Sequence, residues 1–311
     1  MYDLIIIGGG IAALSAALYA GRFQLKTLVI AEKLGGTIIL TDDISNYPGF
    51  KKITGMDLFE KIKEHAKDYD IEILEKKATK VEKCKDCLKV STKEKTYKTK
   101  TIIFATGTEW RKLNVPGEKE FANRGVHYCG LCDGPIYKNK IIAVVGGSDS
   151  AAKEALLLAE YGKKVYIIYR KEKIRAEPIN AKKVEQNKKI EIINNANIKE
   201  IKGDKFVNSV ILDKPYKGLK EFKLDALFIE IGHIPISDLA SSIGVKTNEK
   251  KEIIIDKDSK TNVKGVFACG DVVNSKFKQA ITGAAEGVIA AYNVYQYVNN
   301  ELPVCGCSED T

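Results

Sequence analysis

The sequence predicts an α/β protein because one pattern, an apolar strand followed by a glycine-rich turn and a helix, occurs twice along the chain. The first copy, YDLIIIGGGIAALSAALYAGR, has its strand at residues 4–7 and its glycines at residues 8–10. The second copy, NKIIAVVGGSDSAAKEALLLAEYGKKVYIIYRK, has strands at residues 141–145 and 165–169 on either side of its helix. A chain of 311 residues has room for about two domains, which agrees with two such units.

The turn of the first copy is predicted to bind the pyrophosphate of a dinucleotide. Gly8, Gly10 and Ala13 form the pattern G-x-G-x-x-A between strand and helix. Glycines there allow a tight turn and let the backbone approach a pyrophosphate, which the positive end of the helix attracts. The next strand, KTLVIAEK, ends where an acidic residue normally bonds a ribose hydroxyl. Ala31 occupies the usual position, so the adjacent Glu32 is the candidate ribose ligand.

The second copy carries basic residues where the first carries an acid. Arg170 and Lys171 follow its closing strand, and Arg175 lies further along the chain. An acid at this point selects a free 2′-hydroxyl, whereas a basic cluster selects a 2′-phosphate, so we predict an NADP site. Solvated surface charge is the alternative. Ser148 replaces the second motif glycine, which puts a side chain where the backbone would approach the pyrophosphate.

The net charge of +9 comes from lysines spread along the whole chain, which favours a solvated surface over a nucleic-acid site. The N-terminal segment lacks the basic region and the small-residue cleavage site of a secretory signal. Its apolar run is interrupted by glycines and is shorter than the ~20 residues that span a bilayer. We therefore expect a cytoplasmic protein with neither nucleic-acid nor membrane partners.

Seven cysteines are too few for a disulfide-stabilised scaffold at this length, but their spacing is informative. They form the C-x-x-C pairs Cys84/Cys87 and Cys129/Cys132, the C-x-C pair Cys305/Cys307 and the single Cys269. A C-x-x-C pair is a metal knuckle, a redox dithiol or chance, and a structural zinc site needs four ligands. The lysine-rich CKDC stretch favours a hairpin turn with a surface disulfide or an unused thiol pair. The C-x-C tail is either an electron shuttle or incidental, and no metal site is expected.

Four further motifs are specific in combination: ATGTEWRKLNVPGE (105–118), CGLCDG (129–134), GVFACGDV (265–272) and KQAITGAAEG (278–287). They occur in the order found in low-molecular-weight thioredoxin reductases, which the chain resembles over essentially its whole length. The resemblance implies an α/β fold of two Rossmann-like three-layer ββα domains, with the NAD(P) domain inserted into a split FAD domain, and a homodimer. The implied boundaries are 1–116 and 235–311 for the FAD-binding domain and 117–234 for the NADP-binding domain with its redox dithiol.

The resemblance also implies which residues bind the two cofactors. Together with the candidate Glu32, those for FAD are Gly8, Gly10, Ala13, Gly35, Gly36, Thr37, Asn46, Thr106, Gly107, Asp271, Gln279 and Ala280. Those for NADPH are Gly146, Ser150, Ala151, Arg170, Lys171 and Arg175. Tyr169 and Lys171 replace a histidine and an arginine of the family's H-R-R-x-x-x-R pattern. Some relatives take electrons from ferredoxin or a deazaflavin, so the donor stays open between these, NADH and NADPH.

The activity that the resemblance implies is reduction of a thioredoxin or glutaredoxin-like protein, with electrons passing from NADPH through FAD to the Cys129–Cys132 dithiol. Cys132 would lie against the flavin, Cys129 would be the interchange thiol that meets the partner, and Asp133 would protonate the departing thiolate. The sequence favours a strand-facing His127 over one that assists the dithiol. A flavin- or zinc-binding scaffold without activity is the non-enzymatic alternative, and the intact Cys129, Cys132 and Asp133 argue against it.

Overall fold

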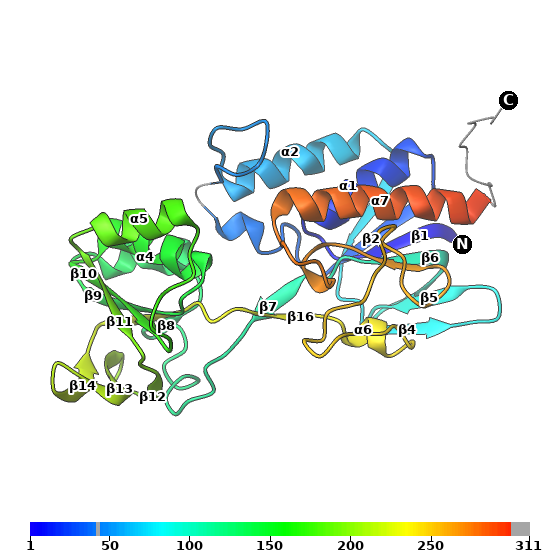
Figure 1. Ribbon diagram of the computed structural model, residues 1–311. Helices are drawn as coiled ribbons and strands as arrows, with labels where there is room; N and C mark the ends of the chain where they lie inside the picture. Colours follow the sequence, from blue (N-terminus) through cyan, green and yellow to red (C-terminus); the bar gives the residue numbers. More distant parts are fainter. Residues whose placement is uncertain (42–43, 300–311) are drawn as a thin grey trace, which may run out of the picture. The chain divides into compact units, whose positions relative to one another are not determined.

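Two compact units make up the part of the chain that the structure, a computed structural model, describes: residues 1–41 and 44–299 (Figure 1). The first unit comprises Met1–Glu109 and Ile234–Thr311, and the second comprises Trp110–His233. The second unit is therefore inserted into the first along the sequence. The sequence predicts domain boundaries after residues 116 and 234, whereas the boundaries between the two compact units lie after residues 109 and 233. At this crossover, the strands β7 (Thr108–Trp110) and β16 (His233–Pro235) pair with each other.

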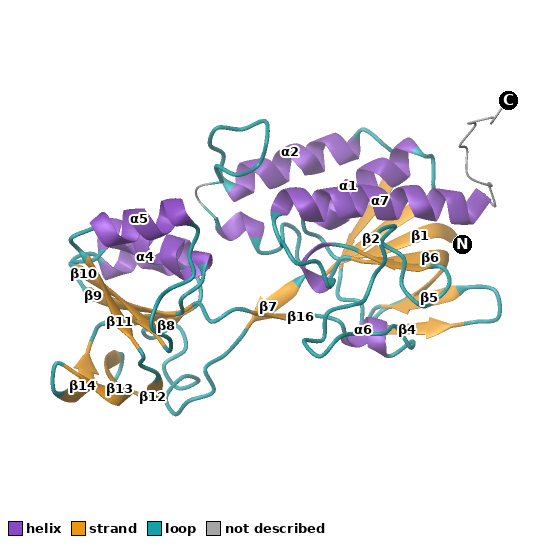
Figure 2. Ribbon diagram, in the orientation of Figure 1, coloured by secondary structure: helices purple, strands orange, loops and turns teal. Residues whose placement is uncertain are grey.

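Within the described residues, the first unit is built on a seven-stranded sheet. Its strands are β1 (Tyr2–Ile7), β2 (Thr27–Ala31), β3 (Ile71–Glu75), β4 (Lys80–Lys83), β5 (Leu88–Ser91), β6 (Thr96–Phe104) and β17 (Val266–Ala268). The order is β3-β2-β1-β6-β5-β4, and β17 also pairs with β6. The strands β1, β2, β3, β6 and β17 pair in parallel, whereas β4, β5 and β6 pair antiparallel. Figure 2 shows the helices α1 (Ile11–Arg22), α2 (Gly55–Lys67) and α7 (Ala280–Asn299) together on one face of this sheet.

The apolar run of β1 is buried on both faces of the sheet, which is why it does not alternate with polar residues. Leu4 and Ile6 pack into the cluster formed with α1 and α7. Ile5 and Ile7 pack on the opposite face, with residues of the short helix α6 (Asp238–Ser241) and the segment after it. The unit therefore has a central sheet with a helical layer on one side and mostly irregular chain on the other.

The second unit has a five-stranded parallel sheet in the order β11-β10-β9-β15-β8. These strands are β8 (Val126–His127), β9 (Ile141–Val145), β10 (Lys164–Tyr169), β11 (Ile190–Asn194) and β15 (Ala226–Ile229). The helices α4 (Asp149–Tyr161) and α5 (Pro178–Gln186) pack on one face, and an antiparallel sheet of β12 (Ile198–Gly203), β13 (Val207–Tyr216) and β14 (Leu219–Lys223) packs on the other. This is a three-layer ββα arrangement, and it confirms the predicted fold class.

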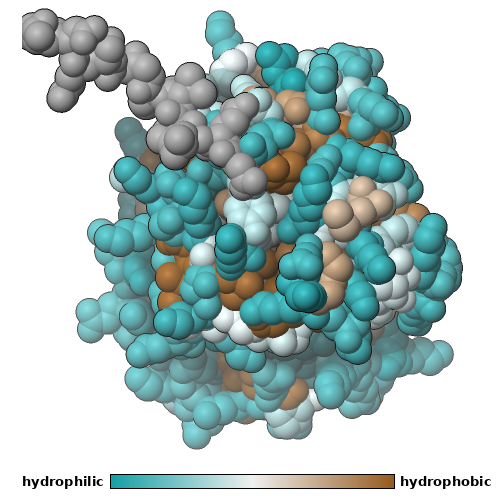
Figure 3. Space-filling model, turned by 90° about the vertical axis from the view of Figure 1, so that its right-hand side faces the viewer, coloured by the Kyte–Doolittle hydropathy of each residue, from teal (hydrophilic) through white to brown (hydrophobic). Residues whose placement is uncertain are grey.

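The surface is mainly hydrophilic, as expected from the lysine content. Figure 3 shows one face, on which hydrophilic side chains surround smaller apolar patches. Several lysines form short-range surface ion pairs, such as Lys63 with Glu60 and Lys76 with Glu94. No helix among residues 1–41 and 44–299 is long and apolar enough to cross a membrane.

Two buried carboxyl groups lie close together in the second unit. Glu154 lies on α4, and Glu230 follows β15 directly. Burial raises the pKa of Glu154 to about 7, and the nearby charge of Asp133 adds to the rise. Burial, followed by the charge of Glu154, raises the pKa of Glu230 to about 8. The native second unit therefore keeps protons on these side chains at pH values where an unfolded chain has released them.

Replacing Gly287 with alanine is expected to destabilise the first unit even though alanine is the better helix former. A Cβ atom at Gly287 of α7 would lie 2.3 Å from the backbone oxygen of Ala12 on α1, and this oxygen has no room to move. We expect a loss of about 1–3 kcal/mol in the free energy of unfolding, measured by urea titration. The control is Ala285→Gly on the exposed side of the same helix, which loses only about 1 kcal/mol of helix propensity. A gain in stability for Gly287→Ala would contradict the close packing.

The second unit is expected to lose stability as the pH rises from 5 to 8. Glu154 and Glu230 bind protons more tightly in the native state than their ordinary value of 4.5 allows, so their contribution is complete below pH 4.5 and is lost through pH 7 to 8. We expect the Glu230→Gln variant to flatten this fall by about 1–3 kcal/mol in urea unfolding. The exposed Glu172→Gln is the matched control and should keep the wild-type slope. If the free energy of unfolding falls with pH equally in wild type and Glu230→Gln, then Glu230 does not bind its proton more tightly in the native state.

Candidate active site

The carboxyl ends of β1, β2, β6 and β17 meet at one edge of the first unit, and the glycine-rich turn lies there. Gly8 has a φ of +134°, and a Cβ atom on it would lie 2.1 Å from the oxygen of Ala105 at the end of β6. At Gly10, which precedes α1, a Cβ atom would meet nothing closer than 4.0 Å. No side chain caps this end of α1, and Ala13 is fully buried beneath it. The open N-terminus of a helix with bare backbone in front of it fits a pyrophosphate.

A second glycine turn lies against the first. The amide of Gly35 donates to the oxygen of Gly9 at 2.9 Å, and a Cβ atom on Gly36 would be 3.3 Å from the Cα of Gly10. Thr37 follows and precedes a short 3₁₀ helix, Ile38–Leu40. The predicted flavin-side turn and the pyrophosphate turn are thus in direct contact.

Glu32, the candidate ribose ligand, follows β2 at the same edge. Its carboxylate is exposed and forms an ion pair with Lys77 at 2.9 Å. An exposed pair of this kind contributes little stability, so the carboxylate is readily available to a ribose hydroxyl.

Residues from the two sequence segments of the first unit also meet at this edge. The side-chain amide of Asn46 donates to Oε1 of Gln279 at 2.9 Å, although they are 233 positions apart. Ala280 begins α7, and Asp271 lies in the 3₁₀ helix Gly270–Val272 just after β17. All the residues predicted to bind FAD therefore belong to the first unit.

Thr106 and Gly107 hold the segment that returns from the crossover. The hydroxyl of Thr106 donates to the oxygen of Ile236 at 2.6 Å, and the amide of Ile236 donates to the oxygen of Gly107 at 3.0 Å. Gly107 has a φ of +63°, which glycine adopts without strain.

The second glycine turn is in the other unit and repeats the geometry of the first. Gly146 has a φ of +152°, and a Cβ atom on it would lie 2.2 Å from the oxygen of Glu230 at the end of β15. Gly147 leaves room for the ring of Tyr169, which a Cβ atom would approach to 2.3 Å. The hydroxyl of Tyr169 is buried and has no hydrogen-bond partner among the described residues. Ser148, just before α4, is exposed and its side chain does not cap the helix.

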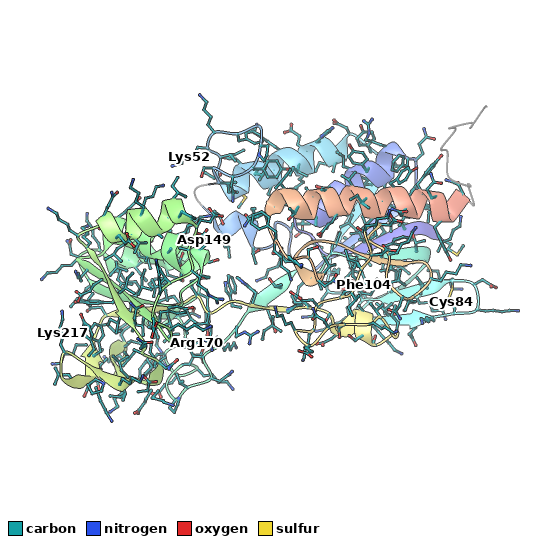
Figure 4. All side chains as sticks on the ribbon, in the orientation of Figure 1. Lys52, Cys84, Phe104, Asp149, Arg170 and Lys217 are labelled. Atoms are coloured by element: carbon teal, nitrogen blue, oxygen red, sulfur yellow. A yellow bond between two sulfur atoms is a disulfide. The ribbon has the colours of Figure 1, made fainter. Side chains whose placement is uncertain are left out.

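The basic cluster surrounds this turn. The backbone amide of Arg175 donates to the oxygen of Gly147 at 2.6 Å, which fixes Arg175 beside the turn. Arg170, labelled in Figure 4, and Lys171 follow β10 directly. All three basic side chains are exposed and form no ion pair with the described part of the chain. Unpaired cations next to a pyrophosphate turn fit a 2′-phosphate better than ordinary surface charge.

The other residues of the predicted NADP site differ in exposure. One residue that supports the site, Asp149, was not predicted from the sequence. Ser150 is exposed in the first turn of α4, whereas Ala151 is fully buried beneath the glycine turn. The carboxylate of Asp149 (Figure 4) accepts from the amide of Glu177 at 2.9 Å and from Asn180 at 2.8 Å. Asp149 therefore holds the start of α5, which follows the basic cluster, and no sequence pattern pointed to it.

The C-x-x-C of the second unit is closed as a disulfide. Cys129 and Cys132 are joined with their Cα atoms 5.4 Å apart, at the start of the short helix α3 (Gly130–Asp133). A 3₁₀ turn, Gly134–Tyr137, follows it. The amide of Cys132 donates to the sulfur of Cys129 at 3.1 Å, which would stabilise a thiolate on Cys129 after reduction. The side chain of Cys132 is exposed and that of Cys129 is half-buried.

Buried polar side chains support this turn from below. Glu154 accepts a short hydrogen bond from the amide of Gly130, inside the dithiol turn. Sequence reasoning missed Glu154, although an acid on the helix face of Ala151, Ala155 and Leu158 was a signal. Nδ1 of His127 lies 3.0 Å from Oδ2 of Asp133. His127 is therefore on the strand, as the sequence favoured, and also next to the predicted acid.

The other cysteines differ in state. Cys84 and Cys87 form a disulfide at the tip of the β4–β5 hairpin, which confirms the predicted turn and selects the surface disulfide over the unused thiol pair. Cys269 is fully buried, and burial raises the pKa of its thiol, so it is not a reactive group. Cys305 and Cys307 lie outside the described residues.

The chain is similar to known reductases over nearly its full length. A family model for pyridine nucleotide-disulphide oxidoreductases matches residues 2–287. Thioredoxin reductase of Bacillus subtilis is 39% identical over 96% of this chain and 95% of its own. The solved thioredoxin reductase of Lactococcus lactis matches with a TM-score of 0.93 and 38% identity, over 97% of this chain and 100% of the other. A solved ferredoxin-flavin thioredoxin reductase from Clostridium acetobutylicum matches with a TM-score of 0.53 and 32% identity, over 96% and 98%.

Two glycine turns and a disulfide in a C-x-x-C turn agree with these similarities. The chain belongs to the pyridine nucleotide-disulphide oxidoreductase family, whose thioredoxin reductases use FAD and NADPH.

Proposed function

We propose that the chain reduces the disulfide of a thioredoxin or glutaredoxin-like protein, using electrons from NADPH. The observation that carries this proposal is the Cys129–Cys132 disulfide, in which the side chain of Cys132 is exposed and which is followed directly by Asp133. The residues at the carboxyl edge of the first unit would hold FAD, which would supply two-electron transfer between NADPH and this disulfide. A structural zinc site or an inactive scaffold gives no reason for a closed, accessible disulfide with an acid beside it.

The two cysteines have different roles in the proposed reaction. Cys129 is the interchange thiol, because the amide of Cys132 already donates to its sulfur and would stabilise its thiolate. Cys132 would be the sulfur that takes electrons from bound flavin, and it would later resolve the mixed disulfide with the partner. Asp133 accepts and returns the proton of the reacting thiol. Glu154 holds the turn through the amide of Gly130 and so keeps the two sulfurs at bonding distance.

The proposed electron donor is NADPH, because three basic side chains without an ion pair among the described residues follow β10, and the backbone of one of them, Arg175, is bonded to the second glycine turn. Charge-assisted hydrogen bonds from Arg170, Lys171 and Arg175 would select a 2′-phosphate over the 2′-hydroxyl of NADH. A ferredoxin is the second candidate. The similarity to a ferredoxin-flavin thioredoxin reductase favours it, as do Ser148 and Tyr169, which depart from the usual NADP pattern.

We also propose a homodimer that acts in the cytoplasm. Ile289 and Tyr292 are exposed apolar residues three positions apart, which places them on one side of α7. A second copy of the chain would cover them. A reducing compartment suits an enzyme that keeps protein dithiols reduced.

Anaerobic addition of NADPH is expected to bleach the flavin absorbance of the purified protein much faster than NADH does. Arg170→Ala and Arg175→Ala should each raise the KM for NADPH about 10–100-fold and leave that for NADH nearly unchanged, because a charge-assisted bond to the phosphate contributes about 1.5–3 kcal/mol. Lys182→Ala, an exposed and unpaired lysine on α5, is the matched control. Bleaching by neither nucleotide, with bleaching by reduced ferredoxin, would overturn NADPH as the donor.

Replacing Cys132 with serine is expected to leave flavin reduction by NADPH intact and to abolish thioredoxin reduction, because electrons enter the disulfide through this sulfur. The two rates are measured separately, by stopped-flow flavin absorbance and by insulin turbidity with added thioredoxin. Cys87→Ser, which opens the hairpin disulfide of the first unit, should retain thioredoxin reduction. Thioredoxin reduction that persists in Cys132→Ser would refute the assigned role.

A further inference from the structure

His127 is buried directly behind the dithiol. It ends β8, two positions before Cys129, and is 2% exposed. Its Nδ1 lies 3.0 Å from Oδ2 of Asp133, and its Nε2 lies 2.8 Å from the hydroxyl of Tyr137. Both ring nitrogens thus face side chains of the segment that carries the dithiol.

The ring of His127 is held in place by aromatic neighbours. It stacks on Phe228 of β15 with a centroid distance of 5.2 Å, and Tyr137 packs against it edge-on at 5.3 Å. The backbone partner of His127 across the parallel β8–β15 pair is also Phe228. A histidine fixed by stacking and by strand pairing cannot follow Asp133, so Asp133 must adjust to the histidine.

The protonation states of His127, Tyr137 and Asp133 decide which group donates each hydrogen bond. Burial lowers the pKa of His127, although Asp133 opposes this, so the ring is neutral near pH 7 and carries one N–H. Burial raises the pKa of Tyr137, which therefore keeps its proton. An ionised carboxylate only accepts hydrogen bonds, so the ring proton belongs on Nδ1 toward Asp133, and the hydroxyl of Tyr137 donates to Nε2.

The contact with Asp133 is close but incomplete while the disulfide is closed. Nδ1 of His127 is buried and has no well-aligned hydrogen bond among the described residues, despite the 3.0 Å separation. A small rotation of the Asp133 side chain, which follows Cys132 directly, would complete this bond.

We propose that His127 is a positioning residue for Asp133, holding Oδ2 of the carboxylate so that Oδ1 is directed at the dithiol. This inference rests on the proposed function. Asp133 takes the proton of Cys132, whose thiolate attacks the sulfur of Cys129 in the mixed disulfide with the partner. The bond between Cys129 and the partner breaks, the Cys129–Cys132 bond forms, and the partner's sulfur leaves as a thiolate that takes the proton from Asp133. The enzyme dithiol is oxidised and the partner's disulfide is reduced.

The charged groups closest to this contact are acidic, and one of them, Asp225, is itself paired with Lys140 at 3.3 Å. Glu154 of α4 is near enough for its charge and that of Asp133 to interact, and the charge of Asp225, just before β15, acts on Tyr137. Neither carboxyl group is hydrogen-bonded to Asp133 among the described residues, since Glu154 accepts from the amide of Gly130 and Asp225 pairs with Lys140. Among the described side chains packed around it, His127 is therefore the donor that stabilises the Asp133 carboxylate.

The test compares two substitutions at His127. His127→Phe keeps an aromatic ring on Phe228 but removes the donor, whereas His127→Asn places an amide N–H near the position of Nδ1. We expect His127→Phe to slow thioredoxin reduction about 10–100-fold, which is less than the roughly 10²–10⁴-fold of a proton-transfer group itself because Asp133 stays in place, and to move the acid limb of the pH–rate profile to higher pH. His127→Asn should recover most of the rate. Flavin reduction by NADPH should be unchanged in both.

Controls separate positioning from a loss of structure. His65→Phe changes an exposed histidine on α2 and should leave both rates unchanged. If His127→Phe binds no flavin or unfolds, Tyr137→Phe removes the donor to Nε2 and should give a smaller shift of the acid limb in the same direction. Equal rates and pH profiles in wild type and His127→Phe would overturn the inference, and so would a loss in His127→Asn equal to that in His127→Phe.

A partner-free measurement distinguishes failure of this inference from failure of the proposed function. The enzyme is first reduced anaerobically, and oxidation of its dithiol by 5,5′-dithiobis(2-nitrobenzoate) is followed in stopped flow. This small disulfide needs no protein partner, so the wild-type and His127→Phe rates remain comparable even if thioredoxin is not the substrate. A slower reaction in His127→Phe, restored in His127→Asn, supports the inference, and equal rates refute it.

Discussion

Close approach of two backbones at the carboxyl edge of a parallel sheet is the constraint on which both cofactor sites depend. In each unit one strand, β1 or β9, leads into a turn whose glycine lies against the carbonyl that follows a neighbouring strand. A Cβ atom would come to 2.1 Å from Ala105 at Gly8 and to 2.2 Å from Glu230 at Gly146. Both glycines have a positive φ, so another residue would meet a steric clash and an unfavourable backbone conformation at once. Without this contact the following helix could not begin at the sheet edge with its N-terminus open.

The second unit carries its redox chemistry on the same framework as its nucleotide turn. β15 contributes Phe228, on which His127 stacks, and ends beside the turn at Gly146. α4 starts after that turn, and its residue Glu154 accepts a hydrogen bond from the amide of Gly130. A single sheet and helix therefore hold both the predicted NADP turn and the dithiol. Glu154 and Nε2 of His127 are hydrogen-bonded to the segment that carries the dithiol, which offsets the cost of burying them.

Much of this arrangement could be predicted from the sequence. Local patterns were enough to predict the strand at residues 141–145, the glycine turns and the hairpin at Cys84 and Cys87, because each depends on residues near one another in the chain. The domain boundary at residue 116 stays a prediction; the compact units change after residue 109, where the β7–β16 pairing links segments that are distant in the sequence. The sequence could not predict that Asn46 and Gln279 contact each other, although it selected both residues as FAD ligands.

The sequence by itself determined the fold class and located the two glycine turns and the C-x-x-C pair, because glycine spacing, apolar strands and cysteine spacing are local features of the chain. Only the tertiary structure decided which polar residues serve the dithiol. Glu154 is 22 positions from Cys132 on a helix, and His127 reaches Asp133 across a tight turn while stacking on a strand a hundred residues away. Such contacts arise from the packing of α4, β8 and β15, and no local pattern encodes the direction in which a buried side chain points.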